Sequence, residues 1–488
     1  ETEDILYVKG SGWDLATIEA QGFAPVRMDV LLKMAKLAKC SDSQMVEIQR
    51  SAMTNPYAPN PSVEAILHAI IPYTFVDHTH ADSVVTLTNT PNGEKIIREI
   101  YGPNMFIVPY IMPGFILAKA IYDMTRNVDW ESLDGMVLLN HGVFTFDHDP
   151  KTSYEKMIRI VTKAEDYLSK KVKLSKPVGK AKEDLLSLAR VRQGVCKARK
   201  KPVLAKLCST KEHISFANRK DLDKIATRGP ITPDHIIRTK RIPALLNSHP
   251  EKDVQKFVKD YFKYFEKYAN GHQTPLDPAP RWGVWAGYGT LAFGHTLKEI
   301  EIITDISRHT ILAIQRAEKL GGWKTLSEKT LFEMEYWELE QAKLKKGSSS
   351  LPYQGKIALV TGAASGIGKA CVDVFAKQGA VVVALDIDSK IKKLFSQPGV
   401  VGVQCDLTKE QQVKKAVAHT VREFGGLDIV ISNAGIFPES ESLDKLQTRN
   451  WEKSLDINLS SHQMLLKQTI PFLEYGVEPT VVIVASKN

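Results

Sequence analysis

The sequence has few cysteines and no long hydrophobic run. Its five cysteines (Cys40, Cys196, Cys208, Cys371 and Cys405) are scattered, and none forms a CxxC pair. A disulfide framework is therefore not indicated, and a reducing cytoplasm is the expected location. No apolar run approaches the roughly 20 residues that a membrane span needs, and the start has no signal-peptide pattern. We therefore expect neither a membrane association nor secretion.

Aromatic residues are absent from the most basic part of the chain. The formal net charge is +9, and Ser169–Lys201 carries much of the excess. Without aromatic rings to stack on bases, this stretch is interpreted as a solvated helical face, and no nucleic-acid partner is expected. An anionic small substrate would tolerate the positive field.

The 488 residues, 43% hydrophobic and 25% charged, indicate a globular protein with two or three domains. The chain begins with Glu1 directly before the strand-like "ILYV", and it stops after "PTVVIVASKN", another strand pattern. Both ends therefore look cut, and a fragment is expected. The sequence has no evident internal repeat.

Strand and helix patterns predict an α/β protein in several parts. Residues 1–200 alternate short apolar runs with helical patterns, and residues 201–344 contain two long helical patterns around a strand–turn–strand segment. "KKGSSSLP" (345–352) is the predicted linker. From residue 353 strands and helices alternate, which predicts a parallel, doubly wound sheet of the Rossmann type.

Two histidines lie one residue apart in an apolar stretch. "TFVDHTHADSVVTLTN" (74–89) reads as a strand, in which His78 and His80 would point to the same face. His141 ends the apolar run "GMVLLNHG", and Glu64 lies in the first turn of a predicted helix, with Ser62 at a position suited to its N-cap. Three imidazoles and a carboxylate predict a Zn²⁺ site that could polarise a carbonyl and hold an enediolate.

A glycine-rich turn follows the first strand of the last part. "VTGAASGIG" places Gly362, Gly366 and Gly368 between a strand and a helix, where backbone N–H groups can bind a pyrophosphate. Asp386 ends the next strand and would accept hydrogen bonds from the adenosine ribose. No arginine follows it immediately, which favours NAD over NADP.

"PSVEAILH", "HTHAD" and "NHG" resemble the class II, zinc-dependent aldolase family, which has a central β-sheet covered by helices and cleaves ketose 1-phosphates. The resemblance implies that His78, His80 and His141 bind Zn²⁺ and that Glu64 is the catalytic acid/base. It also implies that Tyr110 helps to protonate the leaving aldehyde. Ser11 and Gly12 in "KGSGWDL", together with Ser62, match phosphate-binding positions.

These residue types suit the reaction. Retro-aldol cleavage must stabilise the carbanion that remains when a carbon–carbon bond breaks. Zn²⁺ bound by neutral imidazoles keeps its positive charge and can take developing enediolate oxygens. A nearby carboxylate can transfer the proton.

The TGxxxGxG spacing, "CDLT" and "SNAG" resemble the short-chain dehydrogenase/reductase family. "DINL" and "VASKN" supply Asn458 and Ser486, which match catalytic positions of the family. The family's Tyr-x-x-x-Lys would follow the last residue, so this chain is expected to bind NAD without turning over. The cofactor-binding positions implied by the resemblance are Gly362, Ser365, Gly366, Ile367, Gly368, Asp386, Asp406, Leu407, Asn433, Ala434 and Gly435.

The order of the two parts, with "RGPITPDHIIRTK" and "LDPAPR" between them, resembles a family of bifunctional rhamnulose-1-phosphate aldolase/lactaldehyde dehydrogenases. The implied substrates are a phosphorylated ketose and a small aldehyde. A homo-oligomer is also implied, because sites shared between subunits are common in the aldolase family. Two alternatives remain: an epimerase or dehydratase of the same superfamily, and a non-catalytic scaffold, whose cytoskeletal relatives lack the histidine triad.

Overall fold

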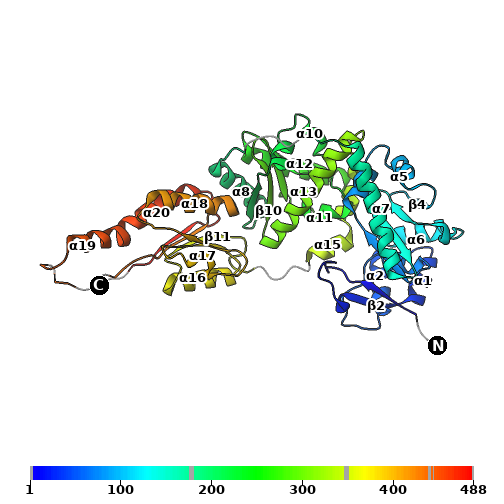
Figure 1. Ribbon diagram of the computed structural model, residues 1–488, viewed down its shortest axis with the longest axis horizontal. Helices are drawn as coiled ribbons and strands as arrows, with labels where there is room; N and C mark the ends of the chain where they lie inside the picture. The colour runs from blue at the N-terminus through cyan, green and yellow to red at the C-terminus, as the bar shows by residue number, and fades with distance from the viewer. Residues whose placement is uncertain (1–3, 175–180, 346–350, 438–440, 443, 486–488) are drawn as a thin grey trace. The chain divides into compact units, whose positions relative to one another are not determined.

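The computed structural model describes residues 4–174, 181–345, 351–437, 441–442 and 444–485 (Figure 1). Contacts within the chain define two compact units, which are taken separately here. Unit 1 comprises Glu1–Ser175, Arg228–Ile237 and Leu312–Gly347, and unit 2 comprises Lys176–Thr227, Arg238–Ile311 and Ser348–Asn488. Among the described residues, no helix combines the length and the apolar composition that a bilayer crossing requires.

Unit 1 is built on a mixed four-stranded sheet in the order β3-β6-β5-β4. The strands are β3 (Phe75–Thr79), β4 (Met105–Val108), β5 (Gly135–Leu138) and β6 (Gly142–Asp147). The β3–β6 and β5–β6 pairs are antiparallel, and the β4–β5 pair is parallel. Every residue of β5 is buried, so this apolar strand lies inside the core.

A separate two-stranded ladder and helices complete unit 1. The ladder joins β1 (Ile5–Lys9) to β2 (Phe23–Arg27) in antiparallel fashion. The helices are α1 (Met28–Lys36), α2 (Asp42–Ser51), α3 (Ala65–Ile70), α4 (Asp82–Thr88), α5 (Gly93–Tyr101), α6 (Phe115–Met124), α7 (Pro150–Lys171), α14 (Glu328–Glu335) and α15 (Glu338–Lys345).

Unit 2 contains a second mixed sheet in the order β7-β10-β9-β8. Its strands are β7 (Leu204–Cys208), β8 (Ala244–Leu246), β9 (Trp282–Trp285) and β10 (Gly289–Gly294). The surrounding helices are α8 (Leu185–Arg199), α9 (Lys211–Ala217), α10 (Leu222–Ile225) and α12 (Pro250–Tyr268). Helices α11 (Ile236–Thr239) and α13 (Leu297–Lys319) are divided between the units, because Ile236–Ile237 and Leu312–Lys319 belong to unit 1.

The two mixed sheets have the same topology, so the sequence-based expectation of no internal repeat is wrong at the level of the fold. In both sheets the first strand pairs antiparallel with the fourth, the fourth antiparallel with the third, and the third parallel with the second. The tight turns also correspond: Asn140 (φ 59°) and Gly287 (φ 87°) are the middle residues of the β5–β6 and β9–β10 turns. The sequence shows no repeat because the same strand pairing can be formed by different side chains.

The remainder of unit 2 is a parallel five-stranded sheet in the order β13-β12-β11-β14-β15, which confirms the predicted Rossmann-type fold. Helices α16 and α17 cover one face, and α18 and α20 cover the other (Figure 1). The elements are β11 (Ile357–Thr361), α16 (Gly366–Lys377), β12 (Val381–Asp386), α17 (Ile391–Leu394), β13 (Val400–Gln404), α18 (Glu410–Phe424), β14 (Ile429–Ser432), α19 (Thr448–Leu455), a π-helical turn (Asp456–Ser460), α20 (Ser461–Leu473) and β15 (Thr480–Ile483).

Three local predictions need correction. The strand expected over 74–89 ends at Thr79, and Asp82–Thr88 is the helix α4; a short β-branched run does not distinguish a strand from a buried helix. Glu64 comes just before α3 rather than in its first turn. Ser62 is not the N-cap, which is Glu64; Ser62 Oγ instead accepts the Glu64 N–H at 3.2 Å in the turn before the helix.

The basic stretch is not one solvated helix. Helix α7 ends at Lys171, and α8 begins at Leu185. Helix α8 buries Leu188, Val191, Arg192 and Val195 in unit 2. Part of the predicted linker 345–352 lies outside the described residues.

Candidate metal centre and nucleotide site

The three predicted histidine ligands come together in unit 1. His78 lies in β3 opposite Phe144 of β6, and His80 follows directly after β3. His141 is the last residue of the β5–β6 turn. Each of the three offers a ring nitrogen, and these atoms lie within 4.8 Å of one another. The antiparallel β3–β6 pairing therefore closes the cluster.

Gly142 makes room for this cluster. A Cβ atom at Gly142 would lie 2.9 Å from the rings of both His78 and His80 and 2.5 Å from the Thr79 carbonyl oxygen. Because real Cβ atoms do not approach backbone that closely, a side chain here would displace the imidazoles. The glycine of the "HG" pair is thus needed by packing, whereas the left-handed residue of the turn is Asn140.

Glu64 lies beside two of the imidazoles. Its Oε1 atom is 3.1 Å from His141 Nε2, and its Oε2 atom is 3.5 Å from His78 Nε2. All three side chains are nearly inaccessible to solvent, with exposures of 5–12%. A carboxylate at this distance can exchange a proton with a group bound at the cluster.

The electrostatics favour the neutral, metal-binding form in two of the three imidazoles. Burial lowers the pKa of His78 to about 3 and also lowers the pKa of His80, so both rings are neutral at pH 7. Burial alone would lower the pKa of His141 as well, but the Glu64 carboxylate outweighs it and raises this pKa. Burial alone would raise the pKa of Glu64, but His78 and His141 hold it below its usual value.

The ring orientations fit a cation. His78 Nδ1 lies 3.1 Å from the Val143 carbonyl oxygen, which can only accept, so Nδ1 carries the proton and Nε2 presents a lone pair. His80 Nε2 lies 3.1 Å from His78 Nε2. Two ligands of a tetrahedral zinc with bonds of about 2.0–2.1 Å stand roughly 3.3–3.4 Å apart. The pair is thus close to the spacing that a shared zinc ion would impose.

The predicted phosphate-binding residues also meet. The backbone N–H of Ser11 donates to the Asn60 carbonyl at 3.0 Å, and Gly10 forms a bridge with Pro61. Gly12 has φ 92°, which favours glycine in this turn. The turn therefore lies beside Ser62, although the two are about fifty residues apart in sequence.

Tyr110 follows β4, and its hydroxyl group is buried with no hydrogen-bond partner among the described residues. Burial raises the pKa of Tyr110 above its usual value, so the phenol stays protonated at neutral pH. A buried, protonated and unpartnered hydroxyl is suited to donate to a bound molecule.

Sequence reasoning assigned no role to the "TPDH" segment, yet the structure places Asp234 at the cluster. Asp234 Oδ1 is 3.7 Å from His80 Nδ1. An acid near a proline turn gives no signal by itself, because its relation to His80 exists only in the folded chain.

The glycine turn of the Rossmann sheet has the geometry expected for a pyrophosphate. Gly362 and Gly366 have φ 63° and 53°, and a Cβ atom at Gly368 would lie 2.2 Å from the Gly362 carbonyl oxygen. Ser365 is the N-cap of α16, and Ile367 is 62% exposed in the first turn of that helix. Asp386 Oδ2 accepts the Ala364 N–H at 2.8 Å and so braces the turn.

The other predicted positions surround the same end of the sheet. Thr361 Oγ1 accepts the N–H groups of Asn433 and Ala434 at 2.9 and 3.0 Å, next to Gly435. Asn458 lies in the π-helical turn and joins the Ile436 backbone through both its amide atoms, at 2.8 and 2.9 Å. π-Helical turns often occur at functional sites.

Three predicted residues add little to the described nucleotide site. Asp406 Oδ1 accepts from the Thr408 N–H and hydroxyl at 3.0 and 2.7 Å, which caps the turn after β13, and Leu407 is nearly buried. Ser486 lies outside the described residues.

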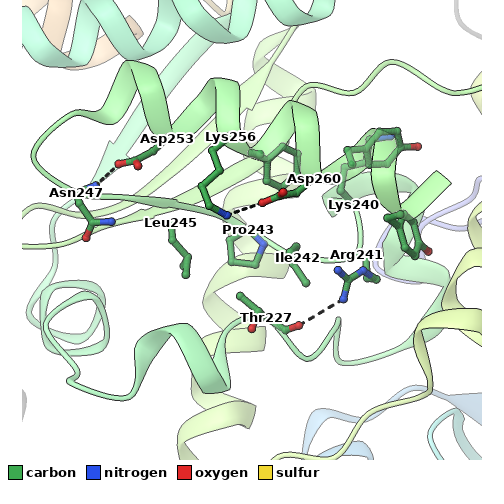
Figure 2. A pocket seen from close by; sticks show the side chains of 13 residues that line it. Thr227, Lys240, Arg241, Ile242, Pro243, Leu245, Asn247, Asp253, Lys256 and Asp260 are labelled. Atoms are coloured by element: carbon green, nitrogen blue, oxygen red, sulfur yellow. Dashed lines mark hydrogen bonds and ion pairs between the residues drawn. The ribbon is translucent and has the colours of Figure 1, made fainter. Parts of the chain in front are cut away.

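A cavity of about 250 Å³ in unit 2 was not expected from the sequence. It lies between α12 and the segment before β8 (Figure 2). Its two carboxylates already have donors: Asp253 accepts from the Asn247 N–H at 2.7 Å, and Asp260 accepts from Lys256 at 2.5 Å. We therefore do not assign the reaction to this cavity.

Comparison with protein families gives three matches. Residues 1–168 match the class II aldolase and adducin N-terminal domain, residues 182–344 match the second domain of class II aldolases, and residues 356–488 match the short chain dehydrogenases. The metal centre thus lies mainly in the first match, and the glycine turn lies in the third.

Individual proteins are similar to different lengths of this chain. An uncharacterized oxidoreductase, YuxG, of Bacillus subtilis is 29% identical over 99% of this chain and 74% of its own length. L-fucose dehydrogenase of Oryctolagus cuniculus is 36% identical over 26% of this chain, and the match spans about half (45%) of that enzyme. A solved class II aldolase domain from Thermoplasma acidophilum is 43% identical over 34% of this chain and 75% of its own, with a TM-score of 0.31.

Proposed function

Since class II aldolase domains are fused here to a short-chain dehydrogenase domain, a lyase joined to an oxidoreductase, we propose a specific pair of reactions. The aldolase part cleaves rhamnulose 1-phosphate to glycerone phosphate and lactaldehyde with a zinc ion held by His78, His80 and His141. The dehydrogenase part oxidises lactaldehyde with NAD. The observation that carries the first reaction is the histidine cluster with Glu64 at 3.1 and 3.5 Å.

The protein's own groups would manage the protons of the cleavage. Retro-aldol cleavage removes the proton of the hydroxyl next to the breaking bond and later returns a proton to the enediolate carbon. Glu64 is ionised beside the cluster and is the group proposed to accept and return protons. The protonated hydroxyl of Tyr110 is proposed to donate a hydrogen bond to the oxygen that becomes the aldehyde carbonyl, without giving up its proton. A bound divalent cation supplies positive charge that stabilises the negative charge developing on substrate oxygens.

A phosphate-bearing substrate is supported by a separate feature. The turn at Ser11 and Gly12, next to Ser62, carries two serine hydroxyls that can donate to an anion. Ser62 Oγ accepts the N–H of Glu64, which lies beside His78 and His141, so the turn is linked to the histidine cluster through Ser62 and Glu64. This supports a substrate with a phosphate at one end and a ketose carbonyl at the other.

NAD is the proposed cofactor of the dehydrogenase domain. Asp386 ends β12, where its carboxylate can accept from the ribose hydroxyls, and a 2′-phosphate would be repelled by this negative charge.

The proposed location is a reducing cytoplasm, which the free thiols of all five cysteines support. We further propose that the protein is a homo-oligomer, as the resemblance to the aldolase family implies.

Product analysis tests the proposal. The purified chain, loaded with zinc, is incubated with rhamnulose 1-phosphate, and glycerone phosphate and lactaldehyde are measured separately. Equal amounts of both products are expected. An epimerised or dehydrated sugar phosphate in place of cleavage would move the function to a sister reaction of the superfamily. No conversion together with no bound metal would leave the scaffold alternative.

A further inference from the structure

The repeated topology reveals an insertion. In the first mixed sheet, three residues (102–104) connect α5 to β4, whereas 18 residues (226–243) connect α10 to β8 at the same place in the second sheet. Ten of them, Arg228–Ile237, belong to unit 1 rather than to the unit of the sheet that carries them. The inserted segment therefore belongs, together with residues 312–344 of the second aldolase domain, to the unit that holds the histidine cluster.

The inserted segment is firmly held in unit 1. Asn89 Nδ2 donates to the Ile231 carbonyl at 2.9 Å, and Thr325 Oγ1 donates to the Pro230 carbonyl at 3.2 Å. Ile236 is fully buried in a cluster with Leu331 and Met334. Contacts on both sides of Asp234 thus fix its position without help from Asp234 itself.

Asp234 faces the second nitrogen of a predicted metal ligand. Its Oδ1 atom is 3.7 Å from His80 Nδ1, whereas His80 Nε2 points to His78. The same Oδ1 atom is buried and has no hydrogen-bond partner among the described residues. Leaving a buried carboxylate oxygen without a donor costs free energy. The His80 Nδ1–H becomes its donor if the two atoms move closer by a few tenths of an ångström.

His78, the neighbouring predicted ligand, shows how a partner at Nδ1 orients an imidazole. The Val143 carbonyl fixes His78 with its proton on Nδ1 and its lone pair on Nε2. His80 Nδ1 has a carboxylate oxygen, not a carbonyl, in the corresponding position. Metal-binding histidines commonly donate their other ring N–H to a carboxylate or carbonyl, which sets the tautomer and increases the basicity of the ligand.

We propose that Asp234 is a positioning residue that holds His80 with its Nε2 lone pair toward the metal, and that the second aldolase domain thereby completes the metal centre of the first. This inference rests on the proposed function for the presence of the metal. It assigns Asp234 no contact with substrate.

The second sheet has no such centre of its own. By strand register, Leu207, Ser209 and Tyr288 stand where the first sheet has His78, His80 and His141. Leucine offers no ligand atom, and a serine and a tyrosine hydroxyl do not replace two imidazoles for zinc. The duplicated domain thus keeps the fold, lacks the ligands and contributes Asp234 instead.

The test measures metal affinity in the full chain. Zinc dissociation constants are determined by competition with a chromophoric chelator for the unaltered chain, Asp234→Ala, Asp234→Asn and the control Asp223→Ala. Asp223 is exposed on α10 near the same segment. Loss of the orienting carboxylate is expected to weaken zinc binding by about 10–100-fold. Asp234→Asn should lose less zinc affinity than Asp234→Ala, because its amide oxygen still accepts a hydrogen bond. Asp223→Ala should bind zinc as tightly as the unaltered chain.

A spectrum separates positioning from general destabilisation. The visible absorption of the Co²⁺-substituted chain reports the ligand field, and it should change in Asp234→Ala but not in Asp223→Ala at equal thermal stability. Unchanged affinity and an unchanged Co²⁺ spectrum in Asp234→Ala would overturn the inference even if turnover fell. If the unaltered chain binds zinc tightly but does not cleave the sugar, the proposed reaction fails while the Asp234 result stands. If the unaltered chain binds no zinc, both fail.

Discussion

Arg192 of α8 and Asp428 at the start of β14 form a bidentate ion pair with no exposure of either side chain. The Nη1–Oδ1 and Nη2–Oδ2 distances are 2.9 and 2.6 Å, and the exposed fraction is 0% for both residues. Asp428 also accepts the N–H groups of Ile357 and Val477 at 2.8 and 2.7 Å. The pair thus fastens the second aldolase domain to the Rossmann sheet within unit 2.

Asp428→Asn should unfold unit 2 more easily. Removing one partner of a buried pair leaves an uncompensated charge and costs about 3–5 kcal/mol. Urea unfolding of the full chain should show this loss. Asp373→Asn, which breaks only the surface pair with Lys369, should change stability by less than about 1 kcal/mol. Equal losses in both variants would contradict the importance assigned to the buried pair.

Zinc should stabilise the chain through the three histidines. At a free zinc concentration 100 times its dissociation constant, the free energy of unfolding should rise by about 2.7 kcal/mol. His78→Gln should abolish this gain, as measured by thermal unfolding with and without a chelator. His272→Gln, with an exposed imidazole, is the control and should keep the gain. A full zinc response in His78→Gln would be evidence against the cluster.

Glu64→Gln should separate metal binding from proton transfer. The amide keeps the shape of the side chain but cannot accept a proton, so the retro-aldol kcat should fall by about 10²–10⁴-fold while zinc stays bound. Steady-state kinetics and metal analysis of the same sample check this. Glu47→Gln, at an exposed site of α2, should behave like the unaltered chain. A fall in kcat of less than threefold would remove Glu64 from the proton transfer.

Gly368→Ala should impair NAD binding. The added methyl group would lie 2.2 Å from the Gly362 carbonyl oxygen and would force the glycine turn open. We expect NADH affinity, measured by fluorescence titration, to fall at least about tenfold. Gly194→Ala is the control, because its backbone is helical and a Cβ atom there comes no closer than 3.5 Å to Val254, an ordinary van der Waals contact. Unaltered NADH binding in Gly368→Ala would place the nucleotide elsewhere.

Glu299→Gln should alter the acid stability of unit 2. Glu299 Oε1 lies 2.7 Å from Arg199 Nη2; burial alone would raise the pKa of Glu299, but Arg199 and Arg281 hold it below the ordinary 4.5. The stabilisation is therefore complete above pH 4.5 and is lost as the pH falls below that value. Glu299→Gln should cost about 2 kcal/mol at pH 7, with a difference that shrinks below pH 4.5. The exposed Glu301→Gln should show no such pH dependence.

The sequence was most informative where function requires particular residues close together in the chain. The HxH spacing and the "HG" pair predicted a histidine cluster, and the structure brings the three histidines together. The glycine turn predicted positive backbone φ angles, which Gly362 and Gly366 have. The alternation after residue 353 predicted the parallel sheet, because each strand and its helix are adjacent in sequence.

The misses have physical causes. Residues 82–88 contain β-branched side chains that suit a strand or a buried helix, and only packing decides between them. The repeat of the mixed sheet is carried by backbone pairing, which leaves no residue pattern. Asp234 meets His80 across 154 positions of sequence, so no local signal could reveal it.

One titration tests the zinc aldolase directly. Zinc is added stepwise to the metal-free chain in the presence of rhamnulose 1-phosphate, and the rate of glycerone phosphate formation is recorded at each step. The account predicts no cleavage without metal and a linear rise that stops at one zinc per chain. Cleavage that persists without metal, or a fully zinc-loaded chain that forms no glycerone phosphate, would contradict it.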